Sequence, residues 1–297
     1  MSTRQLKCML GLILFCSSIA IAQQNITIEK KFSQYKNGDK LKLSMKGGAP
    51  ISIRGEKDRD TILVRLDSPP EYWVNFQVEK RVLSIEGSYT DTPMPFGKTI
   101  LMSIQLPKNF DLELDSDGGT IQLADLKGNF KGISLGGDIH IAGLEGKIDF
   151  QTNGGNISVN GGNLEGTVRT LGGNIQISEV EGKLHGISDG GRLVYRNVYK
   201  KKYDGEVQLS TLGGDIEIDE APYGASVNTN GGNIIINMAN DNVRAVTKGG
   251  NVILRNIRGN IDAQTHSGNI EAKLLPIHDE EKSQHCNLES KSGDVVL

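Results

Sequence analysis

Residues 154–171 read Gly-Gly-Asn-Ile-Ser-Val-Asn-Gly-Gly-Asn-Leu-Glu-Gly-Thr-Val-Arg-Thr-Leu, and this unit decides the fold. From Gly118 onward a glycine pair returns every 18 residues, apart from two longer steps. A unit this short cannot bury its own apolar face, so successive units must stack into a solenoid with one continuous core. The pairs begin at Gly118, Gly136, Gly154, Gly172, Gly190, Gly213, Gly231 and Gly249, and Ser267/Gly268 and Ser292/Gly293 close the series.

Two apolar pairs recur in each unit when its first glycine is numbered one. Positions four and six are aliphatic, as at Ile157 and Val159, and positions thirteen and fifteen are apolar, as at Ile148 and Phe150. This alternation, rich in β-branched residues, specifies short strands buried on one face. Each unit is therefore predicted to contribute two strands. The predicted fold class is all-β, a single-stranded parallel β-helix (β-solenoid) with 18-residue coils.

Polar residues and glycine mark one corner of every coil. Position seventeen is serine or threonine throughout, and a hydroxyl there can hydrogen-bond along the stack or to the corner backbone. The glycine pair that follows permits positive φ and close stacking of successive corners. Position three is mostly asparagine or aspartate, as at Asn156 and Asp138. At a strand spacing of about 4.8 Å, asparagine amides are expected to form a ladder along the axis.

Other repeat families do not fit this spacing. A calcium-binding nonapeptide roll needs glycine at position four and aspartate at position six, but those places hold Ile157 and Val159. A left-handed hexapeptide helix needs an aliphatic residue at every sixth position, whereas Asn163 and Arg169 follow Ile157 at that spacing. Both families are excluded.

Residues 1–22 are predicted as a secretory signal peptide. Arg4 and Lys7 supply a basic start, residues 9–21 are apolar, and Ala20-Ile21-Ala22 forms a small-residue cleavage site. The apolar stretch is shorter than the ~20 residues of a membrane helix. We therefore expect export without a transmembrane anchor, to the periplasm, the cell surface or the medium.

Cysteine usage and charge narrow the class further. Cleavage leaves Cys286 as the one cysteine, so no intramolecular disulfide is expected. A formal net charge of -3 provides no field that favours nucleic acid. No nucleic-acid partner, metal or cofactor is predicted.

Residues 23–115 are strand-rich but irregular, and they are predicted to form an N-terminal β cap with irregular first coils. The regular solenoid repeats then occupy residues 116–297. Within the first part, Gly47-Gly48-Ala49-Pro50-Ile51 has the character of a degenerate coil. A cap is expected because the end of a solenoid exposes unpaired strand edges and apolar core.

Several motifs carry a family resemblance. They are the segment from Lys31-Phe32 through Gly38 to Leu43, the run Ile51-Ser52-Ile53-Arg54-Gly55, the strand Ile104-Gln105-Leu106-Pro107, and the repeated Thr-x-Gly-Gly-Asn/Asp-Ile units. In these motifs the chain resembles the bacterial putative adhesins, a domain family of unknown function, over nearly all of its mature length. The resemblance implies a secreted, right-handed β-helix, and it brings no catalytic residues.

The first longer step adds five residues to the Gly190 coil and contains a dense run of basic and aromatic residues. Tyrosine rings can stack on sugars, and lysines can meet carboxylates or phosphates. The run is therefore a candidate ligand-binding surface for an acidic glycan or an envelope component, with a solvated charged loop as the alternative. Its candidate residues are Tyr195, Arg196, Tyr199, Lys200, Lys201, Lys202 and Tyr203.

Three other segments hold candidate groups. The insertion 275–285 matches no metal-site spacing, and a solvated acidic loop is the favoured interpretation of its His278, Asp279, Glu280, Glu281 and His285. The loop 88–98, with Tyr89 and Phe96, is a possible contact surface that we expect to pack against the cap. Asp115 and Asp117 would suit paired hydrolytic carboxylates, although acidic residues are common in tight turns.

The regularity of the coils favours a binding or structural role. Coils of 18 residues leave little chain to shape a water-excluding pocket. We therefore expect a non-catalytic, secreted or cell-envelope β-solenoid with an adhesin-like function. The alternatives are a polysaccharide-active β-helix enzyme and a self-assembly module, the latter because Val295-Val296-Leu297 would leave an open strand edge for another chain.

The period makes a direct prediction for deletions. Removing residues 136–153, one whole coil, should leave a folded and shorter solenoid, because every following residue keeps its position in the stack. Removing nine residues instead should turn apolar side chains outward and cause unfolding or aggregation. Circular dichroism and thermal melting of the two purified variants test this, and equal stability would contradict the 18-residue period.

Overall fold

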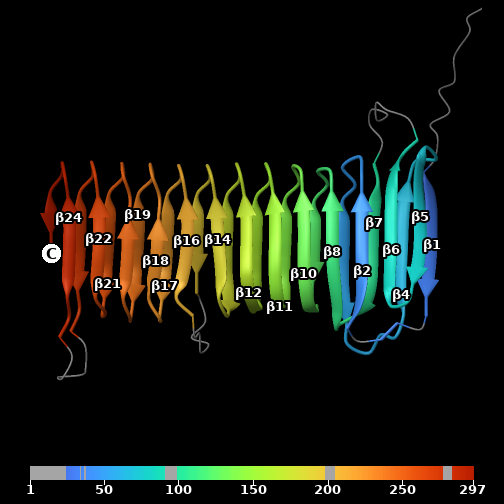
Figure 1. Ribbon diagram of the computed structural model, residues 1–297, viewed down its shortest axis with the longest axis horizontal. Helices are drawn as coiled ribbons and strands as arrows, with labels where there is room; N and C mark the ends of the chain where they lie inside the picture. Colours follow the sequence, from blue (N-terminus) through green and yellow to red (C-terminus); the bar gives the residue numbers. More distant parts are fainter. Residues whose placement is uncertain (1–24, 34, 37, 91–98, 198–204, 277–282) are drawn as a thin grey trace, which may run out of the picture.

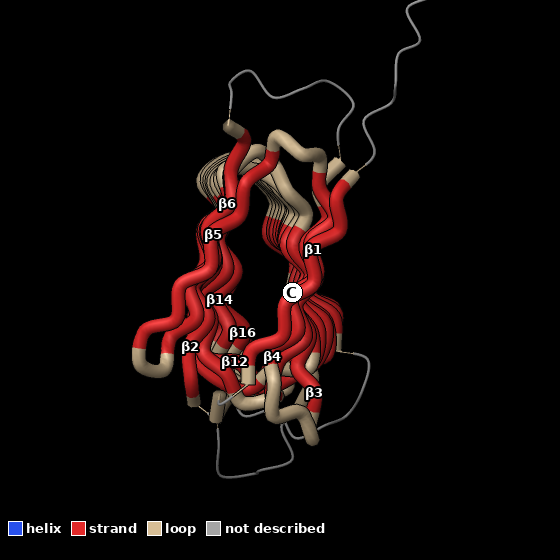
Figure 2. The backbone as a smooth tube through the Cα atoms, turned by 90° about the vertical axis from the view of Figure 1, so that its right-hand side faces the viewer, coloured by secondary structure: helices blue, strands red, loops and turns tan. Residues whose placement is uncertain are grey.

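The computed structural model describes residues 25–33, 35–36, 38–90, 99–197, 205–276 and 283–297. These residues form 25 strands and no helix, stacked along one long axis (Figure 1). Viewed from the N-terminal end, two walls of strands face each other across the interior (Figure 2). The all-β solenoid predicted from the repeat is thus confirmed. The expected signal peptide, residues 1–22, lies outside the described residues.

Each wall is a ladder of hydrogen-bonded strands, mostly parallel. Sheet 1 contains, in spatial order, β1 (Ile26–Phe32), β4 (Ile62–Ser68), β7 (Leu101–Pro107), β3 (Ile51–Glu56), β9 (Ile121–Ala124), the first halves of β11 (Ile139–Thr152) and β12 (Ile157–Thr170), β13 (Ile175–Glu181), β15 (Leu193–Arg196), β17 (Ile216–Ala221), β19 (Ile234–Ala239), β21 (Val252–Ile257), β23 (Ile270–Leu274) and β25 (Val295–Val296).

Sheet 2 contains β5 (Tyr72–Glu79), β6 (Val82–Tyr89), β2 (Asp39–Met45), β8 (Phe110–Ser116), β10 (Lys127–Ser134), the second halves of β11 and β12, β14 (Leu184–Ser188), β16 (Val207–Thr211), β18 (Ala225–Asn228), β20 (Val243–Val246), β22 (Ile261–Thr265) and β24 (Cys286–Ser290). Because β11 and β12 run through both walls, the two sheets are joined.

The register follows the sequence period. Ile139 pairs with Ile157, and Ile157 with Ile175, so that position four stacks on position four from coil to coil. The side chains at positions four, six, thirteen and fifteen are buried almost without exception and form one core along the axis. Burial of this continuous apolar strip is the main stabilising term of the stack.

The N-terminal end departs from simple coil order. The coil of β2 and β3 stacks in register on β8 and β9, as the degenerate coil at Gly47-Gly48 predicts. Its other side, however, is covered by β6 and β7, which come later in the chain. Beyond them, β5 pairs antiparallel with β6, while β4 pairs antiparallel with both β7 and β1. These antiparallel strands cover the parallel ladders at this end, so that among the described residues the outermost strands are β1 and β5.

From Thr152 to Thr265, a buried hydroxyl at position seventeen joins each corner to the corner before it. The Thr152 hydroxyl donates to the carbonyl oxygen of Gly137 at 2.9 Å and accepts from the N–H of Gly155 at 3.3 Å. The same pair of bonds recurs at Thr170, where the distances are 2.8 and 3.0 Å. Of the two partners expected for position seventeen, the corner backbone is therefore the one used. Each hydroxyl satisfies two buried backbone groups that have no place in the strand ladders.

The position-three ladder forms, but mainly through the backbone. The N–H of Asn174 donates to Oδ1 of Asn156 at 2.9 Å, and the N–H of Asn156 donates to Oδ1 of Asp138 at 2.7 Å. The expectation of an amide-to-amide ladder is thus corrected. The side chain is needed as an acceptor, which explains why aspartate alternates freely with asparagine at this position.

The two glycines of each pair have different roles. A Cβ at Gly155 would overlap the carbonyl oxygen of Gly137 in the preceding coil, so this glycine is required for close approach. At Gly154 the nearest atom to an added Cβ, the Cα of Gly136, lies 4.0 Å away. Neither glycine has a positive φ, so the conformational freedom expected of the pair is not what the corner uses.

This asymmetry predicts a matched pair of variants. Gly155→Ala should destabilise the fold by roughly 1–3 kcal/mol, because the methyl group forces the stacked corners apart. Gly154→Ala should change the free energy of unfolding by less than about 0.5 kcal/mol. Chemical denaturation of both proteins measures the difference, and equal losses would show that the first glycine is also constrained.

Candidate functional site

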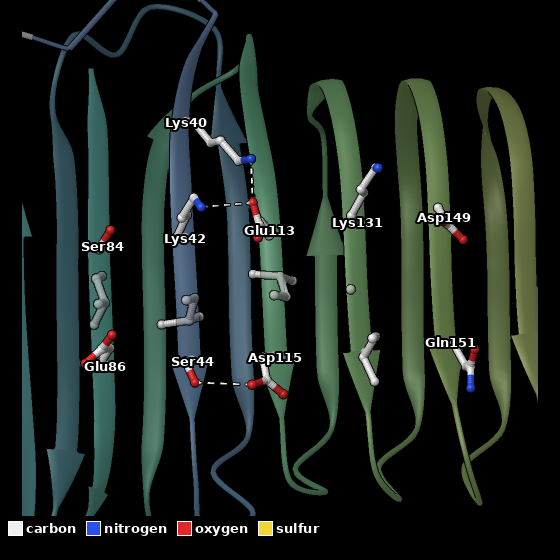
Figure 3. Close-up of a pocket in the computed structure, with 15 residues that line it drawn as sticks. Lys40, Lys42, Ser44, Ser84, Glu86, Glu113, Asp115, Lys131, Asp149 and Gln151 are labelled. Atoms are coloured by element: carbon white, nitrogen blue, oxygen red, sulfur yellow. Dashed lines mark hydrogen bonds and ion pairs between the residues drawn. The ribbon is translucent and has the colours of Figure 1, made fainter. Parts of the chain in front are cut away.

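The outer face of sheet 2 is hollowed into an open groove of 730 Å³. The groove crosses β6, β2, β8, β10 and β11, which lie side by side in that order (Figure 3). Its volume is within the about 300–1,000 Å³ of small-molecule sites. We call it the sheet 2 groove, and its outward-facing side chains are Lys40, Lys42, Ser44, Ser84, Glu86, Glu113, Asp115, Lys131, Ile133, Asp149 and Gln151.

Strand register arranges these side chains in two rows across the groove. Neighbouring strands are about 4.8 Å apart, so each row spans about 19 Å from β6 to β11. The first row carries alternating charge over its last four members. The first row is Ser84, Lys42, Glu113, Lys131 and Asp149, and the second is Glu86, Ser44, Asp115, Ile133 and Gln151.

Some of the groove's charges are paired within the protein. Lys40 and Lys42 both reach Oε2 of Glu113, at 2.5 and 3.5 Å. The hydrogen bond from Lys40 is the main reason why the pKa of Glu113 lies below its ordinary value. Asp115 accepts from Ser44 Oγ at 3.4 Å and from Lys46 Nζ at 3.2 Å. The bond to Asp115 in turn raises the pKa of Lys46.

The remaining polar side chains of the groove are available to a ligand. Five of them make no hydrogen bond or ion pair with any part of the chain that the structure describes: Ser84, Glu86, Lys131, Asp149 and Gln151. Between them, Ile133 exposes 53% of its surface. The groove therefore offers donors, acceptors and an apolar patch on strands whose backbones are fixed on both sides.

The sequence interpretation missed this groove for an identifiable reason. Its residues on β10 and β11 occupy positions fourteen and sixteen of their coils, which alternate with the buried positions and keep no constant residue type from coil to coil. The feature that could have revealed the groove is the alternating charge of Lys42, Glu113, Lys131 and Asp149, which lie side by side on neighbouring strands. These residues come from distant segments of sequence, and the noncontiguous pairing of β2 with β8 brings Lys42 to Glu113.

The basic and aromatic run of the Gly190 coil is only partly described. Tyr195 is 2% exposed and belongs to the core, so it is wrong to include it among surface residues that contact a ligand. The repeat already indicates that Tyr195 is buried, because it occupies position six of its coil. In the structure it pairs with Ile177 and Ile218, which occupy the same position in the neighbouring coils. Arg196, at position seven, is exposed, and its Nε lies 3.7 Å from Oδ2 of Asp219. Tyr199, Lys200, Lys201, Lys202 and Tyr203 lie outside the described residues.

Asp115 and Asp117 do not form a free carboxylate pair. Lys46 lies between them, with Nζ 3.2 Å from an oxygen of each. Asp117 also accepts the backbone N–H of Gly47 at 3.3 Å. These contacts make the corner aspartates part of the junction between the β2–β3 coil and the first regular coil.

The other candidates fall near the ends of the molecule. Tyr89 is buried, and its ring meets that of Tyr72 edge-on at a centroid distance of 5.1 Å, as expected for packing against the cap. The remainder of that loop, residues 91–98, is outside the described part, as are His278, Asp279, Glu280 and Glu281. His285 is described and donates its backbone N–H to Asn260 Oδ1 at 2.8 Å. Val295, Val296 and Leu297 are exposed, and self-association through that edge stays a prediction.

Within the described ranges, no group of three or more His, Cys, Asp or Glu side chains is placed to bind a metal ion. The same ranges contain no helix with the length and hydropathy needed to cross a membrane. The expected lack of a metal, cofactor and membrane anchor stays a prediction.

Comparison with known proteins places this geometry in a family. Toastrack DUF4097, a domain of unknown function, matches residues 16–297. No curated protein matches the sequence. Solved structures similar to this chain include a putative adhesin from Parabacteroides distasonis, with 12% identity, a TM-score of 0.37, and coverage of 93% of this chain and 98% of that one.

A putative lipid binding protein from the same organism has 13% identity, a TM-score of 0.39 and the same coverage of 93% and 98%. A putative adhesin from Bacteroides fragilis has 17% identity, a TM-score of 0.31, and coverage of 92% of this chain and 97% of that one. Similarities at this level carry no argument about a shared ligand.

Proposed function

The chain belongs to the Toastrack DUF4097 family, and from that premise we propose that it is a non-catalytic, adhesin-like binding scaffold. In this proposal the protein acts outside the cell or at the cell envelope, where the expected signal peptide would direct it. The scaffold presents the sheet 2 groove to an envelope component. The observation that carries the proposal is a groove of 730 Å³ with five polar side chains that have no partner in the described part of the protein.

The chemistry of two glutamates, Glu113 and Glu145, favours binding over acid catalysis. A glycoside-cleaving enzyme needs a carboxyl group that stays protonated near neutral pH, which requires a raised pKa. The pKa of Glu113 and the pKa of Glu145 both lie below the ordinary value of a glutamate. In each case the main cause is a hydrogen bond from a lysine, Lys40 for Glu113 and Lys108 for Glu145. Such groups are acceptors at neutral pH rather than general acids.

An arginine placed in the groove tests this proposal. Ile133→Arg should fill the groove and pair with Asp115, which faces Ile133 across the strands. Binding of the variant to an envelope fraction should then be about tenfold weaker than binding of the parent protein. Neither the parent nor the variant should shorten the polysaccharide chains in that fraction. Leu212→Arg is the matched control, because Leu212 is exposed to the same degree, 54% against 53%, and lies outside the groove.

Binding by a plate or biolayer assay and size-exclusion analysis of the polymer give the two readouts. Equal binding by Ile133→Arg and Leu212→Arg would move the site away from the groove. Shortening of the polymer by the parent protein would instead support the alternative of a polysaccharide-active enzyme.

A second contact surface in the proposal is the insertion that contains Tyr199, Lys200, Lys201, Lys202 and Tyr203. Its chemistry suits an acidic glycan, since three consecutive lysines supply positive charge beside two tyrosines. Arg196, which precedes the insertion on β15, is exposed.

Replacing Lys200, Lys201 and Lys202 with serine tests this second surface separately. The melting temperature should stay nearly unchanged, because exposed substitutions usually alter stability by less than about 0.5 kcal/mol. Binding to acidic glycans should weaken, and the binding that remains should depend less on salt. A triple variant that binds acidic glycans as the parent does would show that the insertion is a solvated loop.

A further inference from the structure

The sequence contains one tryptophan, and it lies on the same face as the sheet 2 groove. Trp73 is on β5, the strand beyond β6 in sheet 2, and 42% of its surface is exposed. In the antiparallel pairing of these strands Trp73 is opposite Ser88, and Asn75 is opposite Glu86. Trp73 is therefore a diagonal neighbour of the groove residue Glu86, at a Cα separation of about 7–8 Å.

Residues of β5 other than Trp73 make the contacts that hold this strand against the cap. Phe76 on β5 packs against Phe32 of β1, with ring centroids 5.7 Å apart. The ammonium group of Lys30 lies 4.3 Å from the centroid of the Phe76 ring. The neighbouring Tyr72 is buried, and its hydroxyl donates to the carbonyl oxygen of Lys46 at 2.9 Å. These contacts involve the neighbours of Trp73, and the exposed part of the indole lies on the same side of sheet 2 as Glu86.

The charge of the groove argues against a strongly acidic or basic ligand. Three lysines line it beside four carboxylates, and Lys46 offsets one of these by pairing with Asp115. The unused groups, Glu86, Lys131 and Asp149, have mixed sign as well. A polyanion would meet carboxylates along both rows, and a polycation would meet lysines. A neutral ligand with many hydroxyl groups satisfies both kinds of side chain, because a hydroxyl donates to a carboxylate and accepts from an ammonium group.

We propose that the sheet 2 groove binds a neutral oligosaccharide chain, with Trp73 as the stacking platform at one end. The proposal rests on the binding function proposed above and names its ligand class. One sugar ring packs its apolar face on the indole, which offers a large, flat and rigid surface. The following units run along the rows toward Lys131 and Asp149, which hydrogen-bond their hydroxyl groups. Ile133 supplies a second apolar contact within the groove.

The groove also has the rigidity that such binding needs. Its polar groups project from β6, β2, β8, β10 and β11, and each of these strands is paired on both sides. The backbone positions of the donors and acceptors are therefore fixed before the ligand arrives, which limits the entropy lost on binding.

Because Trp73 is the sole tryptophan, its fluorescence reports directly on the groove. The mature protein is titrated with three neutral probes, the hexamers of β-1,4-linked glucose, α-1,4-linked glucose and β-1,4-linked N-acetylglucosamine, and with an acidic galacturonic acid hexamer. At least one neutral probe should shift the emission, with an affinity that changes less than about twofold between roughly 0.05 and 0.5 M salt. The acidic probe should leave the emission unchanged.

Calorimetry then follows the variants that remove the fluorophore or the polar groups. Trp73→Ala should weaken binding of the neutral probe about tenfold, and Trp73→Phe should restore part of that loss. Tyr223→Ala is the control, since Tyr223 is 39% exposed at a distant turn. The double variant Lys131→Ala/Asp149→Ala should also weaken binding about tenfold. It leaves the cap intact, so it tests the site even if Trp73→Ala fails to fold.

The results separate this inference from the broader function. If the envelope fraction binds through the groove but no neutral hexamer does, the ligand class is wrong while the scaffold function stands. Preferential binding of the acidic hexamer, or equal affinity of parent and Lys131→Ala/Asp149→Ala, would also overturn the inference. An emission shift that grows with protein concentration in the absence of sugar would assign the groove to a second copy of the chain instead.

Discussion

The close stacking of the regular coils depends on a buried hydroxyl group that bridges neighbouring corners. Seven successive corners contain this bridge: Thr152, Thr170, Ser188, Thr211, Thr229, Thr247 and Thr265. At Thr170 the hydroxyl receives the N–H of Gly173 at its own corner and donates to the carbonyl oxygen of Gly155 at the preceding corner. A hydrogen bond of this kind contributes about 1 kcal/mol net, but each buried backbone group left without a partner would cost about 1–3 kcal/mol. The bridge also needs the second glycine of the pair, since any Cβ there would occupy the space of the adjacent carbonyl. Hydroxyl and glycine are thus one structural unit.

The hydrogen-bonded corners also determine how side chains are arranged on the outer faces of the two sheets. Once each coil is set at the strand spacing, outward side chains are aligned in rows whose chemistry depends only on which residues the sequence supplies. Some outward side chains pair with one another, as Asn237 does with Asp219 at 3.2 Å and Arg255 does with Asn237 at 2.8 Å. In the sheet 2 groove, Lys131 and Asp149 have no such partner among the described residues, and they lie in a row with Lys42 and Glu113 across a hollow of 730 Å³. A regular scaffold can therefore acquire a binding surface by changes at outward positions alone, at little cost to stability.

The sequence predicted some features of the structure correctly and others only in part. The repeat predicted the strands, the core positions and the stacked register, because an 18-residue period leaves one way to align identical coils. The repeat also indicates that Tyr195 is a core residue, because it occupies position six of its coil. Its basic neighbours had suggested that it lies on the surface. The position-three residues were expected to pair through their amides. In the structure Asn156 instead accepts the backbone N–H of Asn174 in the next coil. This contact depends on how the backbones of successive corners are placed, which the residue types do not reveal.

Local alternation and the recurring glycines are properties of the sequence, and they were enough to specify the coil, its two strands and the place of its corner. The tertiary structure alone decided which distant segments share a face. The coil of β2 and β3 inserts between β6–β7 and β8–β9, and this order brings Lys42 beside Glu113 and places Trp73 next to a groove that ends at Gln151. Strand order at the cap is set by how antiparallel strands close an exposed edge, which is a packing requirement of the whole molecule rather than a property of any one repeat.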